Sequence, residues 1–265
     1  MMYIGIYFLL ILLLLTIFSG IVVAVDALLS RCKKCPRPAE NEKMPLILDY
    51  SKSLFPVFLA VLLLRAFIAQ PFKVPSGSLE PTVIPGDFML VTQYNYGLRM
   101  PVWNNTIIPI GTPERGQIAL FRWPVNPNVT FVKRVVGLPG DRISYINKVL
   151  TINGRVCAQT FIKNGVDIED GDAEPAKIYE ENLLGVKHKI LIHSDMPGQD
   201  FQNLIVPPHE YLMMGDNRDA SDDSRDWGFV SINDFIGRAR FVWFNWNSEL
   251  PWSQKVNWHR IGTVL

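Results

Sequence analysis

The N-terminal segment constrains this chain most, because Met1 to Val25 contains no Asp, Glu, Lys or Arg. About 20 apolar residues in a helix are enough to span the hydrocarbon core of a bilayer. We therefore predict a transmembrane helix over residues 1–25, with Tyr3 to Val25 as its apolar run. A cleaved secretory signal is the alternative, but the run is long, no basic region precedes it and no small-x-small site follows it.

A second apolar stretch, Leu54 to Ala69, predicts a second transmembrane helix over residues 54–70. Arg65 lies near its end, where a long side chain can reach the lipid headgroups. A buried core helix is the alternative that length alone leaves open.

The loop between these helices, residues 26–53, has an excess of basic over acidic side chains. The basic residues are Arg31, Lys33, Lys34, Arg37, Lys43 and Lys52, and the acids are Asp26, Glu40, Glu42 and Asp49. Because Lys and Arg concentrate in cytoplasmic loops, this loop is expected in the cytoplasm and residues 71–265 outside it. Cys32 and Cys35 form a lone C-x-x-C there, without the second pair that a zinc ribbon needs, and we interpret them as incidental thiols.

Residues 71–265 have the pattern of an antiparallel β domain. Short runs rich in Val, Ile, Phe and Tyr alternate with Gly- and Pro-containing turn signals. The clearest runs are Phe88 to Thr92, Ile118 to Arg122, Phe131 to Val136 and Val149 to Ile152. We therefore predict a mainly β fold with a smaller inserted β subdomain at about residues 145–206. Within it, the acidic run Asp167 to Glu174 is interpreted as a solvated tip.

The chain shows neither a G-x-S-x-G nor an H-E-x-x-H motif. The formal net charge is only +1, and no basic face favours nucleic acid. Three other blocks are distinctive: PSGSLEPT at residues 75–82, FVKRVVGLPGD at residues 131–141 and GDNRDASDDSRDWG at residues 215–228. The first alone would be an ordinary turn, because Pro, Gly and Ser are common turn formers.

Together the three blocks resemble the type I signal peptidases, the bacterial leader peptidases. That family has two membrane spans with a basic cytoplasmic loop, then Pro-Ser-Gly-Ser, a Lys-Arg block and a Gly-Asp-Asn box. The likeness runs from about Ser53 to the C-terminus and is weakest in the insert. It implies a membrane-bound serine endopeptidase that removes signal peptides through an acyl-enzyme, without a cofactor or a metal. It also implies a location in the inner (plasma) membrane, with the catalytic domain on the periplasmic side.

The resemblance assigns roles to residues of the three blocks. Ser78 is the implied nucleophile, Lys133 its general base, Ser76 an oxyanion-hole donor and Ser221 the residue that orients the lysine, with Asp223 and Arg225 as a supporting ion pair. The family has Met where this chain has Leu79, and often an apolar residue at Glu80. Since Leu and Met have similar volumes, we expect only small effects on substrate preference.

A Ser/Lys pair works only if the lysine loses its proton. The pKa of a free lysine is about 10.4, and burial can lower it by up to about 3 to 5 units. The apolar residues expected to bury Lys133 are Phe121, Phe131, Val132 and the pair Met213 and Met214.

The implied substrates are secreted precursors with small residues at the first and third positions before the cut. Shallow pockets lined by Phe72, Val74, Leu79 and Val132 could exclude larger side chains. The other expected partners are the lipid bilayer and the protein translocation channel. Two alternatives stay open: a self-cleaving repressor-type Ser/Lys protease, and a non-catalytic membrane-tethered binding module.

Overall fold

The computed structural model describes residues 2–31, 45–99, 106–169, 172–247, 252 and 255–265. It divides into two compact units. One comprises residues 1–69 and 99–107, and the other comprises residues 70–98 and 108–265. The predicted role of Cys32 and Cys35 falls outside the described residues.

The first unit is helical. It contains α1 (Met2–Arg31) and α2 (Leu46–Leu63), and α2 continues into the short π-helix η1 (Leu64–Ile68). Within the described residues, two segments are long and apolar enough to cross a membrane, Tyr7–Arg31 and Leu46–Ile68. Both helices extend beyond the apolar runs seen in the sequence. Asp26 and Lys52 form an ion pair of 2.7 Å in these extensions, where the sequence suggested a loop.

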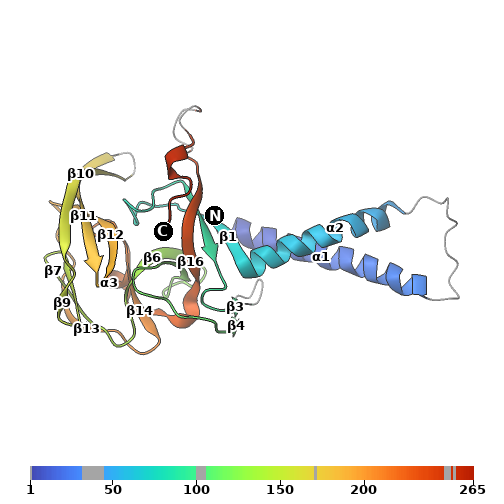
Figure 1. Ribbon diagram of the computed structural model, residues 1–265, viewed down its shortest axis with the longest axis horizontal. Coiled ribbons are helices and arrows are strands. Elements are labelled where there is room, and N and C mark those ends of the chain that lie inside the picture. The colour runs from blue at the N-terminus through green and yellow to red at the C-terminus, as the bar shows by residue number, and fades with distance from the viewer. Residues whose placement is uncertain (1, 32–44, 100–105, 170–171, 248–251, 253–254) are drawn as a thin grey trace. The chain divides into compact units, whose positions relative to one another are not determined.

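The second unit is built on a seven-stranded sheet with the order β1-β2-β16-β5-β6-β14-β15. Figure 1 labels β1, β16, β6 and β14 of this sheet. Its strands are β1 (Ala69–Lys73), β2 (Asp87–Thr92), β5 (Ile118–Arg122), β6 (Thr130–Gly137), β14 (Glu210–Met214), β15 (Val230–Ser231) and β16 (Phe235–Asn245). The remaining short elements are β3 (Leu98–Arg99), β4 (Thr106–Ile108), α3 (Ser224–Trp227), η2 (Ile232–Asp234) and η4 (Trp258–Arg260).

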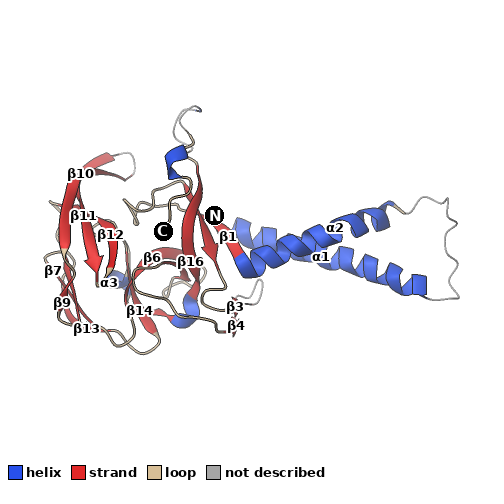
Figure 2. Ribbon diagram, viewed as in Figure 1, coloured by secondary structure: helices blue, strands red, loops and turns tan. Residues whose placement is uncertain are grey.

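Two smaller antiparallel sheets lie between β6 and β14 in the sequence. One has the order β13-β7-β8-β9, and the other has the order β10-β11-β12. Their strands are β7 (Arg142–Ile146), β8 (Val149–Ile152), β9 (Arg155–Val156), β10 (Gln159–Glu169), β11 (Asp172–Leu183), β12 (Val186–His193) and β13 (Phe201–Ile205). Figure 2 shows strands throughout this unit and long helices only in the other. The mainly β class with two apolar N-terminal helices is confirmed.

Neighbouring side chains of β6 and β14 pack into two different hydrophobic clusters, because successive residues of a strand face opposite ways. Val135 and Met213 belong to one cluster, with Phe121 of β5. Val136 and Met214 belong to the other, with residues of the inserted sheets such as Ile143. Strand β6 is therefore held on both faces, which fixes the position of any functional side chain that it carries.

A third cluster lies under the segment that follows β1. Val74, Leu79 and Val83 pack there against Met89 and Ile118. Leu79 is only 1% exposed, and burial of a leucine side chain contributes about 1.5–3 kcal/mol. The cluster thus anchors both ends of the turn between Val74 and Leu79 to strands β2 and β5.

Candidate active site

Ser78 lies in a turn whose main chain is tied at several points. The Val74 N–H donates to the Asp87 carbonyl over 2.8 Å, and the Glu80 N–H donates to the Gly77 carbonyl over 2.9 Å. The hydroxyl oxygens of Ser76 and Ser78 lie 3.5 Å apart. Ser76 is exposed and Ser78 is half-buried. The turn therefore presents two hydroxyl groups to the same region.

Lys133 projects from β6, where it pairs with Ala119 of β5. Its side chain is almost completely buried, with an exposed fraction of 4%. The ammonium nitrogen lies 5.8 Å from the centre of the Phe131 ring. Burial lowers the pKa of Lys133 to about 8, while the charges of Asp223 and Asp222 oppose this shift. A neutral amine is therefore accessible near neutral pH.

Ser221 connects this lysine to a buried ion pair. The Lys133 Nζ donates to Ser221 Oγ over 3.0 Å, and Ser221 Oγ donates to Asp223 Oδ2 over 3.0 Å. Arg225 donates two hydrogen bonds to Asp223, from Nε to Oδ1 and from Nη2 to Oδ2, both over 2.8 Å. Burial raises the pKa of Asp223, but the hydrogen bonds and charge of Arg225 outweigh it and hold the pKa below its ordinary value. The ionised Asp223 thus accepts the hydrogen bond of the Ser221 hydroxyl, and the Ser221 oxygen accepts the one from the lysine.

Residues 215–217 hold this network against the Ser78 turn. The Asn217 N–H donates to the Ser78 carbonyl over 3.2 Å. The Gly215 N–H donates to Asp223 Oδ2 over 2.9 Å. A Cβ atom at Gly215 would overlap Ser221 and lie 2.5 Å from the Ser78 carbonyl oxygen. Only glycine therefore allows the Ser78 turn and Ser221 to approach this closely.

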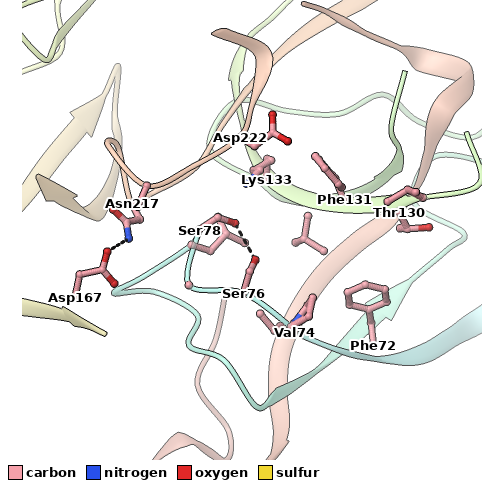
Figure 3. A pocket seen from close by; sticks show the side chains of 16 residues that line it. Phe72, Val74, Ser76, Ser78, Thr130, Phe131, Lys133, Asp167, Asn217 and Asp222 are labelled. Atoms are coloured by element: carbon pink, nitrogen blue, oxygen red, sulfur yellow. Dashed lines mark hydrogen bonds between the residues drawn. The ribbon is translucent and has the colours of Figure 1, made fainter. Parts of the chain in front are cut away.

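A pocket of about 430 Å³ lies where these elements meet (Figure 3). Ser76, Ser78 and Lys133 line it, as do the four residues that the sequence suggested for substrate binding, Phe72, Val74, Leu79 and Val132. The lining does not include Ser221, Asp223 or Arg225, and this network contacts the pocket through the hydrogen bond between Lys133 and Ser221. Among the hydrogen bonds of the described residues, none joins Lys133 directly to Ser78.

The two methionines expected beside Lys133 lie apart from the pocket lining. Met213 shares a cluster with Phe121 and Phe131, the aromatic residues on the lysine's face of the sheet. Met214 packs into the other cluster, beside Val136. The pair therefore does not form one wall, because consecutive residues of β14 face opposite sides.

Four polar residues of the pocket were given no role from the sequence: Thr130, Asp167, Asn217 and Asp222. Asp167 corrects the expectation of a solvated acidic tip, because it is only 3% exposed. It accepts hydrogen bonds from Asn217 Nδ2 over 2.6 Å and lies 3.0 Å from His193 Nε2. No local pattern around Asp167 signals this contact, although Asn217 and Asp222 belong to the Gly-Asp-Asn block.

Glu80 adds a second titratable group, two residues after Ser78 in the chain. Burial, assisted by the charge of Asp167, raises the pKa of Glu80 to about 7, and Arg260 opposes the shift. The site therefore has two groups that titrate near neutrality, and only Lys133 of these lines the pocket.

Comparison with known proteins gives matches that cover most of the chain. A family model described as signal peptidase, peptidase S26, matches residues 47–246. Signal peptidase I of Pseudomonas aeruginosa is 39% identical, over 86% of this chain and 84% of the relative, and that of Pseudomonas fluorescens is 40% identical, over 84% and 81%. A crystal structure of a signal peptidase I from Enterococcus faecalis V583 is 27% identical and covers 49% of this chain and 97% of its own, with a TM-score of 0.30. The family match and the two Pseudomonas relatives span most of the sequence, and the chain therefore belongs to the signal peptidase family of serine endopeptidases, peptidase S26.

Proposed function

We propose that the chain removes signal peptides from exported precursor proteins with Ser78 as the nucleophile and Lys133 as the general base. One observation supports this assignment above the others. A buried lysine, whose pKa is lowered to about 8, lines the same pocket as Ser78. A serine hydroxyl attacks a carbonyl only when a base removes its proton, and a neutral lysine can do so.

The first half of the reaction forms an ester. Ser78 Oγ attacks the carbonyl carbon of the scissile peptide bond while its proton passes to Lys133 Nζ. The Ser76 hydroxyl and the Ser78 N–H donate to the developing oxyanion. Lys133 then gives the proton to the leaving amine, the C–N bond breaks and the signal peptide remains attached to Ser78. In the second half, Lys133 takes a proton from a water molecule as that water attacks the ester. The ester C–O bond then breaks, Lys133 returns the proton to Ser78 Oγ and the signal peptide leaves with a new carboxyl group.

Ser221 gives the lysine a defined orientation. Since its hydroxyl donates a hydrogen bond to Asp223, its oxygen accepts an N–H of Lys133. A neutral amine has two N–H groups and one lone pair, so the lone pair is free for the Ser78 proton. Asp223 stays ionised because Arg225 holds it, which keeps this polarity fixed.

The pocket wall suits small side chains before the cut. Phe72 and Val132 contribute half-buried apolar surface, and Val74 and Leu79 close the lining from the buried cluster below. A large residue would have to displace this packed cluster, and overpacking of such cores typically costs about 1–3 kcal/mol. The expected substrates therefore have small residues at the first and third positions before the scissile bond.

Two apolar helices fit a membrane anchor. We place the basic segment of residues 26–53, which includes the facing ends of α1 and α2, on the cytoplasmic side and the catalytic unit on the periplasmic side, as the basic excess of that segment favours. Precursors would then meet the site as they leave the translocation channel, at the lipid surface.

The test is cleavage of a precursor peptide carrying an Ala-x-Ala site by the purified full-length protein, followed by mass spectrometry. Ser78→Ala and Lys133→Met should abolish cleavage, and Ser76→Ala should lower kcat by about 10²–10³. The exposed His259→Ala should keep full activity. A Ser78→Ala protein that still cuts, or a histidine variant as inactive as Lys133→Met, would show that the assignment is wrong.

A further inference from the structure

Three ionisable side chains line the pocket: Lys133, Asp167 and Asp222. Lys133 donates to Ser221, and Asp167 is buried and hydrogen-bonded to Asn217. Asp222 differs from both. It is exposed, and among the described residues it has no hydrogen bond or ion pair. Figure 3 shows it on the Lys133 side of the pocket, with Asp167 and Asn217 on the other side.

The other carboxylates of the Gly-Asp-Asn block all have partners. Asp216 pairs with Arg134, Asp219 with Lys148, Asp223 with Arg225, and Asp226 accepts from Gln199. The block therefore leaves a single carboxylate uncompensated, and that carboxylate lies at the pocket. The charge of Asp222 also acts on Lys133, where it opposes the lowering of the pKa by burial.

The proposed mechanism determines which part of the substrate passes Asp222, and the inference rests on that mechanism. Lys133 must reach the nitrogen of the leaving amine to give it a proton. The chain that follows the cut therefore begins beside Lys133 Nζ, next to Ser221 and hence to Asp222. The residues before the cut occupy the apolar side of the pocket, along Phe72 and Val74.

We propose that Asp222 is a specificity-determining residue, which favours a cationic side chain and disfavours an anionic one at the first two positions after the cut. Opposite charges attract and like charges repel across this exposed rim. For exposed charges the effect is modest, about three- to fivefold in kcat/KM for each change of sign.

The experiment uses three precursor peptides that differ only in the residue after the cut, which is Lys, Gln or Glu. The quantity measured is the Lys-to-Glu ratio of kcat/KM for the full-length protein in detergent. We expect wild type to prefer Lys, Asp222→Asn to lose the preference and Asp222→Lys to reverse it. High salt should weaken the wild-type preference, because it screens exposed charges. A ratio shared by wild type and Asp222→Lys would overturn the proposal.

Asp195→Asn is the matched control. Asp195 is an exposed carboxylate without a hydrogen bond or ion pair to any described residue, and it does not line the pocket. Its ratio should equal that of wild type. Because the ratio compares substrates on one enzyme, any change in the pKa of Lys133 cancels. Cleavage of the Gln peptide by Lys133→Met would contradict the Ser78/Lys133 dyad. The Lys-to-Glu ratio tests only Asp222, so a failure of the dyad and a failure of the Asp222 proposal give different results.

Discussion

Two opposing effects act on the amine of Lys133. Burial disfavours its charged form, and the carboxylates of Asp223 and Asp222 favour it. The balance is a pKa of about 8. At pH 7 about a tenth of the molecules then have a neutral lysine, against fewer than about one in a thousand for an ordinary lysine. Burial therefore raises the competent fraction by more than about a hundredfold.

The rate should follow this protonation. We expect kcat/KM on a leader-peptide substrate to rise about tenfold per pH unit below pH 7 and to level off above about pH 9. Lys133→Arg should be inactive, since arginine keeps its proton.

Glu80, whose pKa is raised to about 7, is a second group whose ionisation could make kcat/KM rise with pH. Glu80→Gln removes that carboxyl and should leave the limb near pH 8 in place. A limb that disappears in Glu80→Gln would assign the titration to Glu80 instead.

The sequence allowed Ser78 and Lys133 to be proposed because each lies in a contiguous motif, and the structure places both in one pocket lining. It could not locate Asp167, whose partner Asn217 lies 50 residues further along the chain. Nor could it show that Asp222 alone among the acids of its block is unpaired. Their pairing depends on Arg134 and Lys148, which come from strands or turns distant in sequence.

The inserted three-stranded sheet contributes directly to the site. Asp167 of β10 holds the Asn217 side chain, and the Asn217 N–H holds the Ser78 carbonyl. This chain of contacts connects an element outside the seven-stranded sheet to the main chain of Ser78, the proposed nucleophile. A substitution in the insert that breaks these contacts should therefore alter the position of Ser78.

Asp167→Ala tests this connection. It removes the partner of Asn217 Nδ2 and of His193 Nε2, at about 1–3 kcal/mol for each unsatisfied group, while His193 Nδ1 keeps its contact with Glu174. We expect a lower melting temperature and a fall in kcat larger than any change in KM. Glu180→Ala is the control on the same sheet, because Glu180 makes only an exposed ion pair with Lys187. An Asp167→Ala protein with an unchanged kcat would contradict the connection.

Local patterns predicted the strands well but not their order. The run Ile118 to Arg122 coincides with β5, and Phe131 to Val136 lies within β6. Turn signals and apolar runs report on neighbouring residues only. The position of β16 between β2 and β5 depends on pairing across more than a hundred residues, and no local pattern encodes it.

For the whole molecule, the cysteines offer a test of topology. Cys157 is completely buried, so an external thiol reagent has little access to it. Cys32 and Cys35 belong to the loop that we place in the cytoplasm. We expect a membrane-impermeant reagent to leave them unlabelled in intact spheroplasts and to label them after permeabilisation. Labelling in intact spheroplasts would contradict the proposed orientation.

The order of strands also has a consequence for biosynthesis. Ser78 follows β1 and precedes β2, Lys133 lies on β6, and β16 joins these two parts of the sheet by pairing with both β2 and β5. Residues 235–245, which form β16, follow both of these parts in the chain. The seven-stranded sheet is therefore complete only after β16 has been synthesised, and until then the Ser78 turn and the Lys133 strand are connected by contacts such as the one between Asn217 and Ser78. We therefore expect the growing chain to become hydrolytic only once residues 235–245 have been made.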